Sequence, residues 1–279
     1  MHFTTLIDAE SLKTSLGDPN LRIIDVRHQL ADTTYGDRVF AESHLPGAVF
    51  LHCDRDLSGV MNGLNGRHPL PERDVLARRL GEIGIGSETQ VVVYDDAQGL
   101  IAGRLWWLLR WLGHDRVAVL DGGLQAWIAA GGALSTELPV FEPARFIAVP
   151  CDSVVDADYV QAFLETSRMY LVDARSPDRF RGENETIDPV GGHIPGAVNR
   201  FFRDNLQESG CFKPAAVLRE EWLALLAGAP PEAVVHQCGS GVSACHNMLA
   251  MEIAGLTGSR LYAGSWSEWC SDPVRPVTR

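Results

Sequence analysis

The feature that most constrains the fold of this chain is an internal repeat relating its two halves. Four segments of the first half recur in the second half in the same order. The matching pairs are Leu21–Arg27 with Met169–Arg175, His44–Val49 with His193–Val198, Val92–Gly99 with Val234–Gly241, and Asp121–Trp127 with Ala263–Trp269. Asp96 and Cys238 are separated by the same number of residues as Trp127 and Trp269, so this pairing makes Asp96 the counterpart of Cys238. The repeat predicts two copies of one structural unit.

Each half alternates short β-type runs with helical patterns. Strands are expected near residues 21–26, 91–94 and 117–120, and again near 169–173, 233–237 and 259–262. Helices are expected near residues 9–16, 72–80, 100–112, 124–130, 157–166, 215–226 and 243–254. Alternation of this kind predicts an α/β fold in which each domain is a parallel sheet flanked by helices.

Three prolines divide the chain into two domains. Pro139, Pro143 and Pro150 mark an extended linker over residues 139–152, because proline fixes the backbone and interrupts regular structure. The expected domains are therefore residues 1–138 and 153–279. At 279 residues the chain is long enough for each domain to bury its own core.

Charge and hydropathy exclude several partners. The net charge of -12 argues against binding to a nucleic-acid backbone. The longest apolar stretch, near residues 105–112, is too short and too interrupted by Arg104 and Arg110 to cross a bilayer, so no membrane span is expected. Residues 1–5 lack the basic and apolar regions of a signal peptide. We therefore expect a soluble, cytoplasmic monomer.

One cysteine of six has an unusual local context. The cysteines are scattered and form no Cys-x-x-Cys pair, so we predict neither a metal site nor a cofactor. Cys238, however, ends the apolar run 233–237 and precedes the small residues 239–243 and a helix. Backbone N–H groups and a helix N-terminus at such a turn favour a thiolate. Cys245 falls inside the expected helix and is predicted to be a buried thiol.

The repeat also distinguishes candidate structural residues from candidate functional residues. A residue present in both halves is expected to be structural, and a residue present in one half is a candidate for function. Buried hydrogen-bonding roles are accordingly predicted for the pairs Asp25 and Asp173, Arg27 and Arg175, and His44 and His193. Trp106, Trp107 and Trp111 follow a helical pattern and are expected to pack in the core. Since Cys238 has an aspartate as its counterpart, the first half is predicted to be inactive.

Three motifs in the second half carry a resemblance to a known family. They are Cys238–His246, Gly192–Asn199 and Gly264–Trp269. With them the chain resembles the tandem-domain rhodaneses, the thiosulfate and 3-mercaptopyruvate sulfurtransferases. The resemblance implies two rhodanese domains, with the active site in the cleft between them and carried by the second. It also implies that Cys238 takes sulfur from a small-molecule donor as a persulfide and passes it to cyanide, a thiol or thioredoxin.

The resemblance further assigns residues to the site. The backbone of Gly239, Ser240, Gly241, Val242 and Ser243 is expected to stabilise the anionic sulfur. The neutral side chains of Gly239 and Ser240 resemble the mercaptopyruvate type, whereas thiosulfate-preferring enzymes carry basic residues there. Thiosulfate remains the alternative donor.

Donor binding and proton transfer are assigned in the same way. Enzymes of the mercaptopyruvate type hold the donor with two arginines. Arg181 matches the first of these arginines, and the segment 184–188 contains no second one. Arg203 is an alternative for the second arginine, but the sequence does not give its position relative to the donor. Ser240, His68 and Asp54 match the family's proposed acid–base group. The alternative is that His68 is a packing contact and Asp54 a turn residue.

Two rival functions use the same cysteine. Cysteine-dependent phosphatases need an arginine to clamp the phosphoryl oxygens, usually six residues after the cysteine, where this chain has Ala244. A persulfide carrier that delivers sulfur to a protein partner is the second rival, and steady-state turnover distinguishes it from an enzyme.

Overall fold

The computed structural model describes residues 2–149 and 151–279, so Pro150 of the expected linker and Met1 of the expected N-terminus lie outside the described residues. The chain forms two compact units that divide after Asp152. Two segments cross this division. Val60–Leu70 belongs to the second unit, and Glu208–Cys211 belongs to the first.

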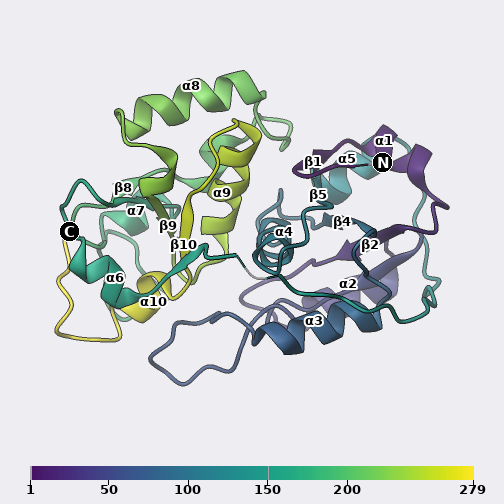
Figure 1. Cartoon of the computed structure of the whole chain (residues 1–279), viewed down its shortest axis with the longest axis horizontal. Helices are drawn as coiled ribbons and strands as arrows, with labels where there is room; N and C mark the ends of the chain where they lie inside the picture. The colour runs from purple at the N-terminus through teal and green to yellow at the C-terminus, as the bar shows by residue number, and fades with distance from the viewer. Residues whose placement is uncertain (1, 150) are drawn as a thin grey trace. The chain divides into compact units, whose positions relative to one another are not determined.

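The first unit is a five-stranded parallel sheet with helices around it (Figure 1). Its strand order is β1-β5-β4-β2-β3, and β2 and β4 pair along their whole lengths. The strands are β1 (Leu6–Ile7), β2 (Leu21–Asp25), β3 (Ala48–Phe50), β4 (Gln90–Tyr94) and β5 (Val117–Leu120). The helices are α1 (Ala9–Ser15), α2 (Tyr35–Glu42), α3 (Arg73–Glu82), α4 (Ala102–Trp111) and α5 (Gly123–Ala129).

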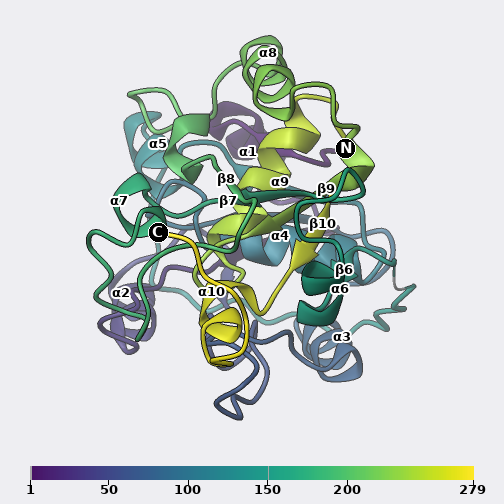
Figure 2. The same ribbon diagram turned by 90° about the vertical axis from the view of Figure 1, so that its left-hand side faces the viewer.

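The second unit repeats this plan, with the strand order β6-β10-β9-β7-β8 that can be followed in Figure 2. Its strands are β6 (Val154–Val155), β7 (Tyr170–Asp173), β8 (Val198–Asn199), β9 (Val234–Gln237) and β10 (Arg260–Tyr262). Its α-helices are α6 (Ala157–Ala162), α7 (Pro177–Phe180), α8 (Ala215–Leu226), α9 (Ser243–Ile253) and α10 (Ser265–Trp269). Two short 3-10 helices, η1 (Phe202–Asn205) and η2 (Pro231–Ala233), complete it.

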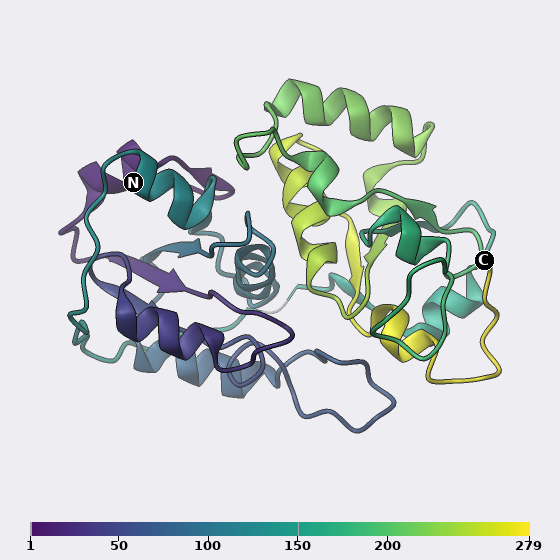
Figure 3. The same cartoon turned by 180° about the vertical axis from the view of Figure 1, so that it is seen from behind.

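Each sheet is covered on both faces. In the first unit one core gathers side chains from α1, α2 and α5, while α4 packs against β4 and β5. In the second unit one core gathers side chains from α6 and α10, while α9 packs against β9 and β10. Helix α8 runs beside α9 (Figure 3). Every residue of β4 and of β9 is buried, as expected for central strands of a parallel sheet.

The structure confirms the predicted fold class and the predicted strands and helices. The prediction missed the elements β1, β3, β6, β8, α2, α7 and α10 and the two 3-10 helices η1 and η2. Trp106, Trp107 and Trp111 are buried, as is the Cys245 thiol in α9. Of the aspartates, arginines and histidines that recur in both halves and were predicted to be buried, all are buried except His193, which is partly exposed. Within the described residues, no helix combines the length and the apolar character needed to cross a bilayer.

Strand register corrects the counterpart of Cys238. In the first unit Asp25 pairs with Tyr94, and in the second its equivalent Asp173 pairs with Gln237. The residue after Tyr94 is Asp95, so Asp95 and not Asp96 is the counterpart of Cys238. The prediction slipped by one residue because Val91, Val92 and Val93 form a run against which Val234 and Val235 align equally well.

Candidate functional site

Cys238 lies at the carboxyl end of β9, in the turn that leads to α9. In open parallel sheets ligands bind at this end of the strands. Val242 and Ser243 lie where the turn meets the helix, since Val242 is the N-cap of α9 and Ser243 is its first residue. Cys238 is 2% exposed, so the protein shields this residue from bulk water.

The turn is built around the sulfur. The Gly241 N–H donates to Cys238 Sγ over 3.2 Å, so one backbone amide of the turn is directed at the sulfur. Gly241 has a φ of +77°, and a Cβ there would lie 2.4 Å from the carbonyl oxygen of Ala263. Position 241 therefore requires glycine both for its backbone conformation and for space.

A second set of contacts fixes the backbone of Cys238. The Cys238 N–H donates to Ser265 Oγ over 3.1 Å, and the Trp266 N–H donates to the Cys238 carbonyl over 3.0 Å. Ser265 is fully buried at the start of α10. Sequence reasoning did not single out Ser265, although it lies in the Gly264–Trp269 motif.

Ser240 and His68 come together beside Cys238. His68 Nδ1 and Ser240 Oγ share a hydrogen bond of 2.7 Å, and both side chains are buried. His68 belongs to Val60–Leu70, so this segment brings a titratable group to the turn from far away in the sequence. A histidine bonded to a hydroxyl is a pair able to move a proton.

Asp54 lies in the first unit, in a group with two histidines. Its carboxylate oxygens lie 3.9 Å from His28 Nε2 and 4.0 Å from His52 Nδ1, and its backbone N–H donates to His52 Nδ1 over 3.0 Å. The turn-residue interpretation fits this last contact. The role of Asp54 as the partner of His68 stays a prediction.

Two arginines that sequence reasoning missed reach the turn. A Cβ built on Gly239 would lie 2.9 Å from Arg67 Nη2 and 3.7 Å from each of the two terminal nitrogens of Arg179. The predicted Arg181 instead has a side chain that is 54% exposed, and it forms a bidentate ion pair with Glu183. Arg179 and Arg181 point apart because residues two positions apart on a helical turn do not share a face.

In the first unit the equivalent turn surrounds the side chain of Asp95. Asp95, at the position of Cys238, is fully buried, and its carboxyl oxygens accept hydrogen bonds from four backbone N–H groups over 2.8 to 2.9 Å. The donors are Ala97, Gly99, Ile101 and Ala102. Burial raises the pKa of Asp95, and the amide hydrogen bonds act in the opposite direction. The amides of this turn in the first unit are therefore bonded to a carboxyl group of the same turn.

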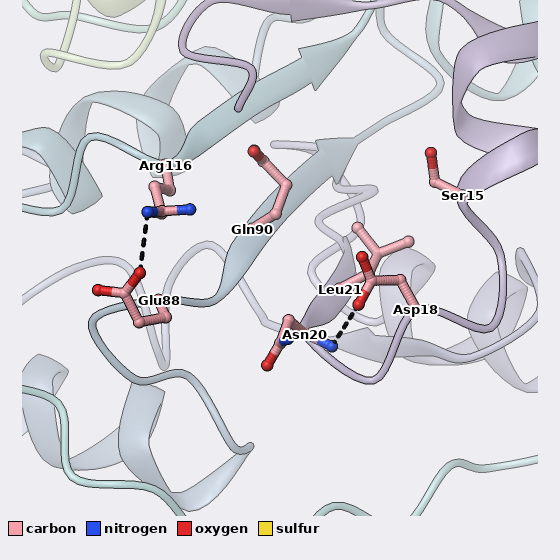
Figure 4. A pocket seen from close by; sticks show the side chains of 7 residues that line it. All are labelled: Ser15, Asp18, Asn20, Leu21, Glu88, Gln90 and Arg116. Atoms are coloured by element: carbon pink, nitrogen blue, oxygen red, sulfur yellow. Dashed lines mark hydrogen bonds and ion pairs between the residues drawn. The ribbon is translucent and has the colours of Figure 1, made fainter. Parts of the chain in front are cut away.

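A pocket elsewhere in the first unit is a weaker candidate. It has a volume of about 150 Å3 and lies at the amino ends of β2 and β4 (Figure 4). Its lining residues are Ser15, Asp18, Asn20, Leu21, Glu88, Gln90 and Arg116. Arg116 is paired with Glu88, and Asp18 accepts from the Asn20 N–H, so its charged groups already have protein partners.

Comparisons with known proteins match both halves of the chain to one family. The family model described as the Rhodanese-like domain matches residues 8–130 and 156–272. The chain is 49% identical over 280 residues to the probable 3-mercaptopyruvate sulfurtransferase of Pseudomonas aeruginosa, covering 99% of both chains. It is 34% identical over 269 residues to the thiosulfate sulfurtransferase of Bos taurus, covering 94% of this chain and 89% of the relative.

A solved structure shares the fold over nearly the whole length. The crystal structure of SseA from Escherichia coli, a 3-mercaptopyruvate sulfotransferase, superposes with a TM-score of 0.81 at 28% identity and covers 95% of this chain and 99% of its own. Since the family model matches both halves, the chain belongs to the rhodanese family and carries two rhodanese-like domains in tandem.

Proposed function

We propose that the chain is a sulfurtransferase that moves sulfur through a persulfide on Cys238, from 3-mercaptopyruvate to cyanide or a thiol. The observation that carries this proposal is a buried cysteine at the carboxyl end of β9, with a backbone N–H on its sulfur and the Ser240–His68 pair beside it. The names of the relatives support the reaction class, because both are sulfurtransferases.

The reaction has two steps. The Cys238 thiolate attacks the donor's sulfur, the S–S bond of the persulfide forms, and the donor's C–S bond breaks with its electrons on pyruvate enolate. Protonation of the enolate gives pyruvate. An acceptor thiolate or cyanide then attacks the outer sulfur, the S–S bond breaks, and the Cys238 thiolate returns.

Each site residue has a role in this proposal. The backbone of Gly239, Ser240, Gly241, Val242 and Ser243 stabilises the anionic sulfur, with the Gly241 amide already bonded to it. Ser240 and His68 exchange the protons of the donor sulfur and the enolate, and Asp54 supports His68. Arg181 was assigned to the donor carboxylate from the sequence. The position of Arg179 beside Gly239 supports Arg179 in that role.

Thiosulfate is the second candidate donor, because a relative named thiosulfate sulfurtransferase, that of Bos taurus, is 34% identical to the chain. A thiol protein such as thioredoxin as acceptor, a monomeric state and a cytoplasmic localisation remain predictions from the sequence.

The test is to measure steady-state transfer from each donor to cyanide and to dithiothreitol, alongside the mass of the peptide that contains Cys238. An enzyme gives turnover and a gain of one sulfur atom on Cys238. A stable persulfide that is released only to a protein would favour the carrier instead. No sulfur adduct with either donor would refute the proposal.

A further inference from the structure

Residues Gly66, Arg67 and His68 are fixed to the second unit at three points. Gly66 has a φ of +79°, and a Cβ there would lie 2.7 Å from the Gly264 carbonyl oxygen. The Arg67 N–H donates to Ser267 Oγ over 3.1 Å. His68 bonds to Ser240. The backbone of Arg67 is therefore held on the turn before α10, and its side chain is directed over the turn that contains Cys238.

The guanidinium groups of Arg67 and Arg179 share one carboxylate. Arg67 Nη1 donates to Asp188 Oδ1, and Arg179 Nη2 donates to Asp188 Oδ2 over 3.2 Å. The Asp188 side chain is 3% exposed, so it is held in place between the two arginines. Arg179 is further fixed by two hydrogen bonds to Glu185.

This pairing leaves one terminal nitrogen on each arginine for another partner. Among the described residues, neither Arg67 Nη2 nor Arg179 Nη1 has a hydrogen-bond acceptor, and both lie next to Gly239. Two such groups beside a nucleophile form a binding position for an anion. Burial lowers the pKa of Arg67, and the negative charge of Cys238 acts in the opposite direction, which agrees with a position close to the sulfur.

The charges around this position nearly cancel. Arg67 and Arg179 contribute two positive charges, and Asp188 and Glu185 contribute two negative charges. The neighbouring Arg175 is paired with Asp173 and also lies 3.6 Å from Glu185. The site therefore offers directed N–H groups without a large net positive charge, and this suits a donor with one negative charge better than a donor with two.

We infer that Arg67 determines donor specificity: with Arg179 it binds the anionic end of the sulfur donor, and Asp188 limits the positive charge available to a dianion. The inference rests on the proposed sulfur transfer. It places the second donor-binding arginine, which the segment 184–188 lacks, on a different part of the chain. The donor carboxylate binds Arg67 Nη2 and Arg179 Nη1, while Asp188 keeps both guanidinium groups aligned.

The test compares kcat and KM for 3-mercaptopyruvate and thiosulfate in the full chain and in Arg67→Gln, Arg67→Lys and Asp188→Asn. Arg67→Gln is expected to raise KM for mercaptopyruvate about 10- to 100-fold, since a charge-assisted hydrogen bond is lost. Arg67→Lys should recover part of this loss, because the charge remains and the fork geometry does not. Arg116→Gln, which makes the same chemical change at an exposed ion pair of the first unit, is the matched control.

Asp188→Asn should shift selectivity instead. Removing one negative charge favours the dianion, so kcat/KM for thiosulfate relative to mercaptopyruvate should rise by on the order of tenfold. Asp37→Asn, at an exposed ion pair with Arg55, is its control. Thermal melting of every variant verifies folding. If Asp188→Asn fails to fold, the two Arg67 variants decide the inference by themselves.

A binding measurement separates this inference from the proposed function. Pyruvate and sulfite, the products of the two donors, are titrated into Cys238→Ser chains with and without Arg67→Gln. Weaker pyruvate binding without Arg67 supports the inference. Unchanged binding, together with a mercaptopyruvate KM within twofold of the control, would overturn it even if the unmodified chain turns over. Absence of turnover in the unmodified chain would count against the proposed function.

Discussion

Asp95 and Cys238 occupy the same position in the two units, each as the first residue after the strand that pairs with β2 or β7. The Asp95 carbonyl accepts the Leu124 N–H over 2.9 Å, and the Cys238 carbonyl accepts the Trp266 N–H over 3.0 Å. One position thus holds a carboxyl group bonded to four backbone N–H groups in one unit and a cysteine bonded to the Gly241 N–H in the other.

Replacement of Cys238 by serine should abolish sulfur transfer and leave the fold intact, because the change is nearly isosteric. The Ser265 hydrogen bond to the backbone N–H of residue 238 does not depend on the side chain and is retained. Transfer assays and circular dichroism check both statements. Residual transfer near the level of the unmodified chain would show that another group carries the sulfur.

Replacement of Asp95 by alanine should destabilise the first unit by about 3 kcal/mol or more, since four backbone N–H groups lose their acceptor. Urea unfolding measures the change. Asp37→Ala, which removes an exposed carboxylate paired with Arg55, is the control and should cost about 1 kcal/mol or less. Equal costs for the two variants would contradict the role given to Asp95.

Replacement of Ser240 by alanine should lower kcat by about 100-fold, because the His68 proton then loses its hydroxyl partner. The pH profile of kcat/KM should change shape as well, and a merely structural serine would not produce that effect. Ser58→Ala, which removes a hydroxyl bonded to the Cys53 carbonyl in the first unit, is the matched control. A profile of unchanged shape would place proton transfer elsewhere.

Paired substitution decides between Arg179 and Arg181. Arg179→Ala should raise KM for mercaptopyruvate about 10- to 100-fold, because Arg179 faces Gly239. Arg181→Ala, as first predicted from the sequence, should raise KM for mercaptopyruvate more than for thiosulfate if Arg181 binds the carboxylate. The exposed ion pair of Arg181 with Glu183 leads us to expect the larger effect at Arg179. Side-by-side kcat/KM values for both donors give the answer, and a larger effect at Arg181 would reverse our assignment.

The buried His236 should make stability depend on pH. Burial lowers the pKa of His236 to about 3, and the ring packs edge-on against Trp222. The unfolded chain therefore binds a proton at His236 near pH 6.5 that the folded chain does not accept until near pH 3. Between these values stability falls as pH falls, by about 1.4 kcal/mol per pH unit from this residue.

The variant His236→Val tests this dependence. Val93, the residue of β4 equivalent to His236, shows that valine fits a central strand of this plan. The slope of the free energy of unfolding against pH, measured by urea titration from pH 6.5 downward, should be shallower in the variant. The absolute stability can change through packing, so only the slope is compared. An identical slope would mean that His236 does not remain neutral in the folded chain.

The sequence predicted the central strands and long helices well, because runs such as Val91–Val93 and Val234–Val235 are apolar enough to be buried on both faces. The strands that were missed, such as Val198–Asn199, are too short to show a period. Cys238, Ser240 and the glycines of the turn could be identified because they are neighbours in the sequence.

The rest of the site could not be predicted, since it depends on distances across the fold. Arg67 reaches Gly239 from a segment that is remote in sequence, and no local pattern reports such a contact. The choice between Arg179 and Arg181 depends on the direction of a side chain at the end of the four-residue helix α7. The one-residue slip at Asp95 arose because a run of valines has no internal landmark.

The membership of Val60–Leu70 in the second unit has a consequence for engineering. A shortened protein that begins at the linker would keep Cys238 but would lose His68 and Arg67 with the discarded half. Chimeras that join the second half of one relative to the first half of another would exchange these two groups as well. If Arg67 binds the donor as inferred above, they would inherit their choice of donor in part from the parent that contributes this short stretch, and not only from the parent that contributes the cysteine.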